Sequence, residues 1–269
     1  MEVNMTFEEF TERYLDYILV PSGLFVMIAY HAWLLFNITR RPSRTVIGLN
    51  TMCRHRWVYN IMSDQTKNGI LGVQTLRNNL MASTLLATIS ITLSSLIGAV
   101  ISSSSKPSDV TYTIHQVKYF SVLICFLAAF FCNMQCVRYY SHSSFLLNVP
   151  LPDGKDEFIE YVAQTLNRGS LFWSLGLRAF YFSFPLLLWI FGPIPMFACS
   201  CLISFSLYFL DTASLASWYL PIGHMNDIDT HSLYFGSITD SIGTAPSEVD
   251  NIYCSLLGIT KLGTTNDTC

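Results

Sequence analysis

The sequence predicts an all-α fold, a polytopic membrane bundle of about four transmembrane helices. Only 12% of the 269 residues are Asp, Glu, Lys or Arg, about half the ~25% that is usual in soluble domains. Hydrophobic residues make up 51% of the chain, and the mean hydropathy is +0.40. They gather in four blocks with few internal charges, at residues 16–37, 80–101, 117–137 and 179–210. A helix of about 20 apolar residues crosses a hydrocarbon core of about 30 Å.

The first block is predicted to be a retained helix rather than a cleaved signal peptide. The stretch before it carries several acids and a single base, Arg13, whereas a secretory signal begins with positive charge. Lys and Arg are concentrated between the first and second blocks and between the third and fourth. Because cytosolic loops are enriched in these residues, residues 38–79 and 138–178 are predicted to be cytosolic. The protein is expected in the plasma membrane or an endomembrane, and four crossings then put both termini outside the cytosol.

The two tails are consistent with that side. Asn4 and Asn266 each begin an N-x-S/T acceptor sequence for N-glycosylation. Cys254 and Cys269 are expected either to form a disulfide in an oxidising lumen or to stay as two free thiols. Residues 1–212 form the predicted helical domain. Residues 213–269 are rich in Gly, Ser, Thr and Asp and are predicted to be a mobile tail.

The second block separates small side chains from large ones. Its large aliphatic residues gather on one side of a helix, where they are expected to face lipid. The other side is the candidate polar face, formed by Ser83, Thr84, Ala87, Ser90, Ser94 and Gly98. Two interpretations stay open. Small residues allow close helix packing in membranes, and the same hydroxyls would line a polar path or cavity.

The fourth block is too long for one straight crossing and contains a helix break. As one helix it would extend about 50 Å. Gly192, Pro193 and Pro195 lie near its middle, and proline removes backbone donors and disfavours helix on its N-terminal side. We expect one span with a kink or an unwound turn, as occurs at substrate sites of transporters. A hairpin of two short segments, with a fifth crossing, is the alternative.

Three charged residues mark the ends of the predicted spans: Asp16, Lys118 and Asp211. In the four-span topology all three belong to the outer side. Ionisable groups at such depth usually find a partner, so Lys118 is expected to pair with Asp211 or Asp16, unless each reaches headgroup water separately. His31 lies inside the first block and is either a hydrogen-bonded packing residue or a proton-sensitive gate.

The predicted cytosolic loops contain helical patterns of their own. Residues 45–63 alternate apolar and basic side chains, which is typical of an amphipathic helix at an anionic inner leaflet. Residues 69–82 lead without a break into the second block, so we expect one helix that projects into the cytosol. Residues 158–166 indicate a further short helix, whose acids are natural partners for the loop arginines.

Motifs of known catalytic sites are missing from the sequence. There is no GxSxG, HExxH, P-loop or strand–helix GxGxxG pattern, and no carboxylate pair in an apolar block supports acid–base chemistry. We therefore predict no enzymatic activity, no catalytic residue, no cofactor and no metal site. The net charge of −3 gives no basis for nucleic-acid binding.

Four segments resemble the plant branch of a membrane protein family known as domain of unknown function 599. They are residues 30–34 (YHAWL), 44–50 (RTVIGLN), 74–84 (QTLRNNLMAST) and 189–196 (WIFGPIPM). The likeness extends over most of the chain, from about Tyr30 to Asp211. It implies a multi-pass membrane protein from a plant, and it implies no activity and no ligand-binding residue.

Two functions compete on these observations. The polar face and the broken fourth block favour a channel or transporter subunit for a small solute or ion. Four helices are few to form a conduction path within a single chain, so this function implies a homo-oligomer in the lipid bilayer. The alternative is a scaffold or regulatory subunit that assembles with other membrane proteins.

Overall fold

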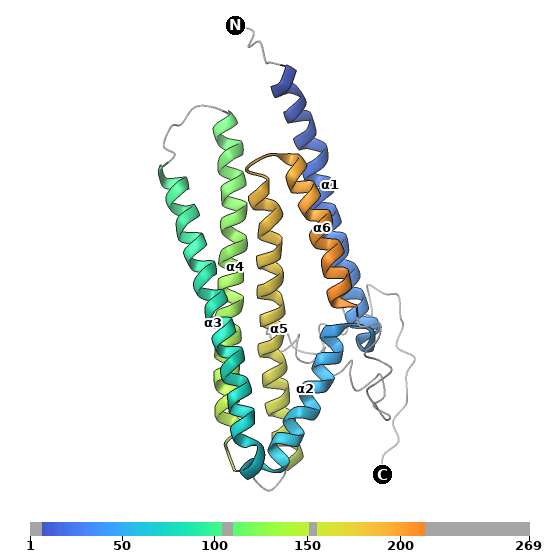
Figure 1. The fold of residues 1–269 in the computed structure, drawn as a ribbon, viewed down its shortest axis with the longest axis vertical. Helices are drawn as coiled ribbons and strands as arrows, with labels where there is room; N and C mark the ends of the chain where they lie inside the picture. The colour runs from blue at the N-terminus through green and yellow to red at the C-terminus, as the bar shows by residue number, and fades with distance from the viewer. Residues whose placement is uncertain (1–6, 104–109, 151–154, 213–269) are drawn as a thin grey trace, which may run out of the picture.

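The computed structural model describes residues 7–103, 110–150 and 155–212, and in these ranges it is a bundle of helices (Figure 1). The candidate sites Asn4, Cys254, Asn266 and Cys269, and the predicted tail 213–269, lie outside the described residues. The elements in chain order are α1 (Phe7–Arg40), the short 3-10 helix η1 (Pro42–Arg44), α2 (Val46–Ser63), α3 (Gln65–Ser103), α4 (Val110–Leu146), α5 (Lys155–Leu188) and α6 (Pro193–Asp211).

Five of these helices, not four, are long and apolar enough to cross a membrane. The apolar segments are Leu15–Arg40, Gln65–Ser103, His115–Leu146, Asp156–Leu188 and Pro193–Asp211. Within the described residues the fold class is all-α, as predicted, and it is compatible with an integral membrane protein. The predicted number of four spans is wrong, because the fourth block contains parts of two helices.

The break at Gly192 is a reversal of the chain rather than a kink. α5 ends at Leu188, and α6 begins at Pro193 and runs back beside α5 and α1 (Figure 1). Gly192 adopts φ +147°, a conformation that residues with a Cβ rarely adopt. Pro193 occupies the first turn of α6, where a missing backbone N–H costs nothing. The prolines therefore start a new helix instead of bending an existing one.

The hairpin that α5 and α6 form at Gly192 determines at which end of the bundle α6 finishes. α1 begins at the end of the bundle that holds the Gly192 turn, and α6 finishes beside η1 at the far end of α1, where Thr45 and Thr212 form an isolated antiparallel bridge (Figure 1). We call this second region, with α2 and the adjoining parts of α3, α4 and α5, the α2 end. Five crossings would leave the two termini on opposite sides, so the expectation of two outer termini loses its basis.

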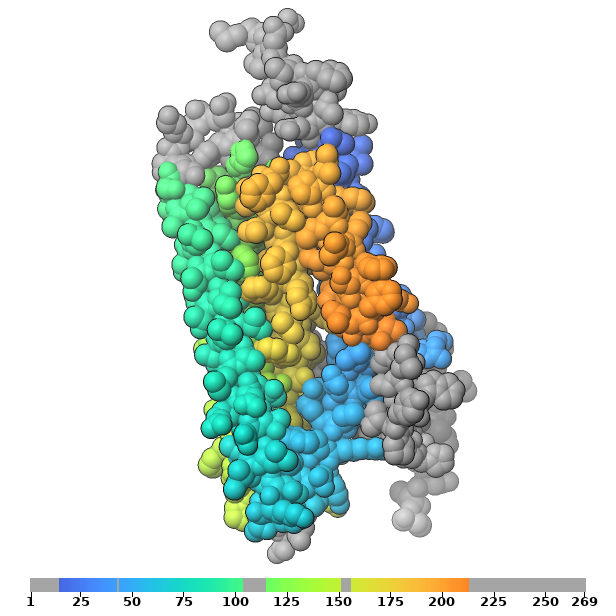
Figure 2. All heavy atoms as spheres, in the orientation of Figure 1, coloured from blue at the N-terminus to red at the C-terminus, as the bar shows by residue number. Residues whose placement is uncertain are grey.

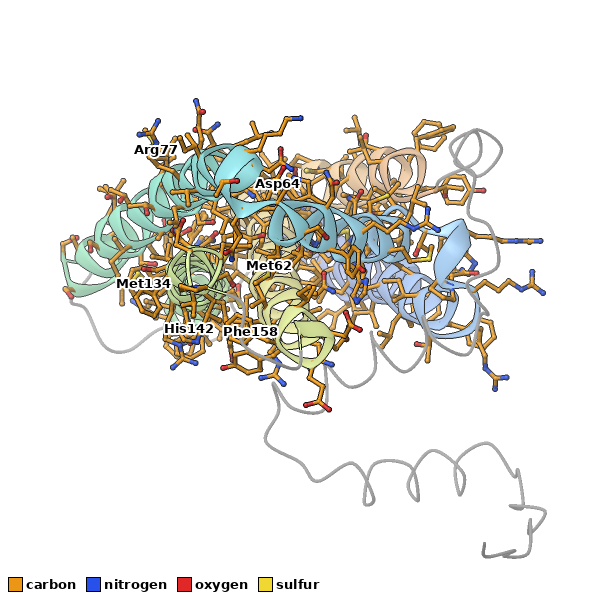
Figure 3. The ribbon with its side chains drawn as sticks, turned by 90° about the horizontal axis from the view of Figure 1, so that it is seen from below. Met62, Asp64, Arg77, Met134, His142 and Phe158 are labelled. Carbon is orange, nitrogen blue, oxygen red and sulfur yellow. The ribbon has the colours of Figure 1, made fainter. Side chains whose placement is uncertain are left out.

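The α2 end has its own hydrophobic core. α3 is one helix of 39 residues, about 58 Å long, which agrees with the expected projection beyond the second block. α2 packs against α5 and α3, and its Val58, Ile61 and Met62 are buried (Figure 3). The amphipathic segment 45–63 is thus a helix whose apolar side contacts protein. The residues of this core are Val58, Ile61, Met62, Leu76, Cys136, Tyr140, Leu146, Leu147, Ile159, Val162, Ala163 and Leu166.

Candidate functional site

The small-residue face of α3 lies in the contact between α3 and α4. Ser83, Ala87, Ser90 and Ser94 are buried there, and Ser83 Oγ lies 3.2 Å from Cys136 Sγ. The remaining two members contribute little to this contact. Thr84 is exposed and donates to its own helix at Leu80 O (2.9 Å), and no atom of a neighbouring helix lies within 4 Å of the position a Cβ would take on Gly98. The arrangement favours close packing over a polar path.

Lys118 joins three elements at the Gly192 end of the bundle. Its buried Nζ lies 3.8 Å from Asp16 Oδ2 and donates to Trp189 O at 3.2 Å. Trp189 Nε1 donates to Asp16 Oδ1 at 3.3 Å, and Lys118 Nζ lies 5.3 Å from the centre of the indole ring. Asp16 is one of the two partners that the sequence suggested for Lys118. The cluster ties α1 and α4 to the turn after α5.

Asp211 lies at the other end of the bundle, away from Lys118. Arg178 Nη2 donates to both of its carboxylate oxygens, at 2.9 and 3.0 Å, and Tyr30 Oη donates to Oδ2 at 2.5 Å. The expected pair of Lys118 with Asp211 is therefore replaced by a contact that joins α5, α6 and α1. The chain reversal at Gly192 explains this, because it returns Asp211 to the level of Arg178.

His31 also contacts α5 through its ring. Its Nδ1 lies 2.7 Å from Met27 O, one turn earlier in α1. The ring meets Phe182 edge-on, with 6.3 Å between ring centres. These contacts are those of a hydrogen-bonded packing residue, the first of the two interpretations of His31.

A cavity of about 330 Å³ lies where α2, α5 and α6 meet, beside the Arg178–Asp211 pair. On the face shown in Figure 2 the surface is hollowed between these three helices. Its lining residues are Val46, Ile47, Asn50, Arg54, Asn79, Tyr140, Ser170, Trp173, Ser174, Leu177, Arg178, Tyr181, Leu207, Leu210 and Asp211.

Helical spacing explains how so many residues reach one cavity. On α5 the lining residues fall three or four positions apart between Ser170 and Tyr181, and on α2 they include Val46, Asn50 and Arg54. Residues at this spacing lie on one face of a helix. The cavity is therefore a groove along α5, closed by α2 on one side and by the last turns of α6.

The family of the chain follows from a comparison with protein-family models. The model described as protein of unknown function, DUF599, matches residues 18–216. The chain belongs to the DUF599 family. No curated protein and no solved structure matched this DUF599 chain in the other two comparisons. All residues that line the cavity fall inside the DUF599 region. The plant branch stays a prediction.

Charge in the cavity of this DUF599 chain is positive on balance. Two guanidinium groups, of Arg54 and Arg178, and one carboxylate, of Asp211, belong to its wall. Arg54 Nε donates to Asn167 Oδ1 at 3.0 Å. Arg178 Nη1 is buried and has no hydrogen-bond partner among the described residues. A buried donor without a partner is costly, so an acceptor at this position would be favourable.

The chemistry of the wall suits an anion better than a metal ion. Arginine and indole groups are donors only, and the asparagine and serine side chains can each donate a hydrogen bond as well. No group of three or more His, Cys, Asp or Glu that could hold a metal ion occurs in the described part of the chain. Sequence reasoning missed this site because residues 38–79 and 138–178 were read as two separate cytosolic segments, and only the packing of α2, α3 and α5 brings Arg54, Asn79 and Arg178 to one cavity.

Proposed function

We propose that this protein is a multi-pass integral membrane protein that binds a small anionic ligand in the cavity between α2, α5 and α6. The observation that carries the proposal is a concave site whose wall holds two arginines and one acid. Arginine donors in a partly enclosed site make strong, charge-assisted hydrogen bonds to carboxylate and phosphate groups. A cavity of about 330 Å³ lies at the small end of the range for ligand sites.

The positive charge at the α2 end supports a cytosolic position for the cavity. Arg40 ends α1, Arg41 and Arg44 follow it, and Arg56 and Arg77 are exposed on α2 and α3. By the positive-inside rule, this end faces the cytosol. In this orientation the cavity takes its ligand from the cytosolic side, in the plasma membrane or an endomembrane.

The test is ligand-induced stabilisation of the purified protein in mild detergent. Phosphate, sulfate, succinate and benzoate are titrated at constant ionic strength, with chloride as the reference. A ligand at 100 times its Kd adds about 2.7 kcal/mol, on the order of 5–10 °C in Tm for a chain of this size. We expect a saturable rise with at least one of these anions, and no rise with any of them would refute the proposal.

A matched pair of variants locates the binding site. Arg54→Gln should weaken the binding of that anion roughly tenfold or more, because it removes one charge from the cavity wall. Arg77→Gln is the control, since Arg77 is exposed on α3 and its side chain points away from the bundle (Figure 3). Equal losses in the two variants would mean that the anion responds to overall charge rather than to the cavity.

Transport of the bound anion is the second candidate function. One arrangement favours it: α1 packs mainly on α6, whereas α3 and α5 pack on either side of α4, and the cavity lies between these two groups. In many carriers, one group of helices moves against the other and so exposes the binding site to each side of the membrane in turn. Uptake of the stabilising anion by liposomes that contain the protein, compared with empty liposomes, tests this function. Homo-oligomers and a scaffold that assembles with other membrane proteins stay predictions from the sequence.

A further inference from the structure

The cavity is not uniform along its length. Towards α6 its wall carries Leu207 and Leu210 of α6 with Val46 and Leu177, beside the Arg178–Asp211 pair, whose charges neutralise each other. Towards the distal part of α2 its wall is polar, with Arg54, Asn79, Tyr140 and Ser170. Two contacts place these parts of the wall along α2. Thr45, just before α2, pairs with Thr212 at the end of α6, whereas Arg54, halfway along α2, donates to Asn167 in the first half of α5.

The wall of the cavity becomes more polar from α6 towards α2, as a bilayer becomes more polar from its hydrocarbon core towards its surface. α6 is apolar enough to cross a membrane, whereas α2 is not among the candidate spans. The end of the cavity at Leu207 and Leu210 therefore adjoins a helix that would lie in lipid. The end at Arg54 lies among helices that project beyond the hydrocarbon core. Trp173 and Tyr181 also line the cavity, and such aromatic side chains are typical of the level of lipid headgroups.

The apolar wall continues onto the outer surface of the bundle. Leu210 lines the cavity and is also 65% exposed. Its neighbour Phe209 is exposed as well. An apolar surface of this kind on a membrane helix faces acyl chains. A chain attached to a ligand in the cavity thus has a path past Leu210 of α6 into the bilayer.

We infer that the anion bound in this cavity is the headgroup of an amphiphile from the inner leaflet, held by Arg54 and its polar neighbours, with its apolar chain directed along Leu207 and Leu210. This inference rests on the proposed anion-binding function and specifies its ligand. The size of the cavity agrees with it, since about 330 Å³ holds a headgroup and the start of a chain. The rest of the chain stays in lipid.

The shared chemistry of a lipid headgroup and a free anion is the phosphate group, and the experiment separates these two sources. The full-length protein in detergent is titrated with dioctanoyl phosphatidic acid, inorganic phosphate and dioctanoyl phosphatidylcholine, and Tm is measured for each. We expect phosphatidic acid to bind roughly tenfold or more tightly than phosphate, because part of its chain is buried. The zwitterionic lipid should bind more weakly than phosphatidic acid, because its choline is repelled by the arginines.

Two leucines of α6 supply the matched variants. Leu210→Ala should weaken phosphatidic acid binding roughly fivefold and leave phosphate binding unchanged, because only the apolar chain contacts Leu210. Leu202→Ala is the control, since Leu202 is 66% exposed on the same helix and does not line the cavity. It should change neither affinity.

The outcomes separate the two proposals. Equal affinities for phosphate and phosphatidic acid, or equal effects of the two leucine variants, would overturn the amphiphile and leave the anion site standing. Equal binding of phosphatidic acid and phosphatidylcholine would overturn the role of the headgroup charge. Failure of all three compounds, and of every soluble anion, to raise Tm would overturn the proposed function itself.

Discussion

At the scale of single residues, the fold brings charges together that the sequence keeps apart. Arg178 and Asp211 are 33 positions apart, and each on its own looks like the end of an apolar segment. Lys118 and Asp16 were found from sequence because both lie where apolar blocks begin on one side. Asp211 was assigned to that same side on the assumption of a single fourth span, and the reversal at Gly192 moves it to the other.

The pair of Arg178 with Asp211 yields a stability prediction. Asp211→Asn removes the charge that balances a guanidinium whose side chain is only 16% exposed. Removing one partner of a buried ion pair costs about 3–5 kcal/mol, so we expect a clear fall in Tm in detergent. Asp156→Asn is the control, because Asp156 is exposed in the first turn of α5 and its change should cost under about 1 kcal/mol. Similar falls in both variants would contradict a structural role for the pair.

At the scale of elements, block length and composition predicted where helices occur but not where α5 begins and ends. α5 carries Glu160, Arg168 and Arg178 within its 34 residues, so its sequence looks like a charged loop followed by an apolar half-span. Glu160 pairs with His55 of α2, and Arg178 pairs with Asp211 of α6. Neutralisation by a distant segment leaves no local signal, and this is why the sequence favoured four spans and gave the hairpin with a fifth crossing only as the alternative.

The docking of α2 on α5 should depend on pH through His55. Its Nε2 lies within hydrogen-bond distance of Glu160 Oε2, and this bond raises the pKa of His55 above 6.5. A raised folded-state pKa means that the stabilisation is fully present below about pH 6.5, the unfolded value, and is lost as the pH rises through the folded value. The difference in Tm between the natural protein and His55→Gln should therefore be larger at pH 6 than at pH 9.

The control for this effect is a second histidine at the α2 end. His142 is exposed on α4, and its side chain is visible near the surface in Figure 3. His142→Gln should lower Tm by little at either pH. A Tm difference for His55→Gln that stays the same from pH 6 to pH 9 would show that the contact with Glu160 does not depend on the charge of the imidazole.

At the scale of the whole molecule, the decisive feature is the direction of the five helices that are long and apolar enough to cross a membrane. α1, α3, α4, α5 and α6 alternate along the long axis of the bundle (Figure 1). The Gly192 turn therefore belongs to one end, and the α2–α3 turn at Asp64 belongs to the other (Figure 3). A single kinked fourth span would instead leave Gly192 in the middle of the membrane.

Labelling of two turns from either side of a sealed membrane distinguishes these topologies. Phe191→Cys lies in the turn before α6, where Phe191 is 79% exposed, and Asp64→Cys lies in the α2–α3 turn. A membrane-impermeant maleimide, with the labelled peptide identified by mass spectrometry, should modify the first from outside the cytosol and the second from the cytosol, because polar reagents do not enter the hydrocarbon core. Leu202→Cys, halfway along α6, should stay unlabelled from both sides.

Protection of Cys at position 191 from both sides would restore the single fourth span. Labelling of positions 191 and 64 from the same side would instead rule out five crossings, and with them the cytosolic cavity.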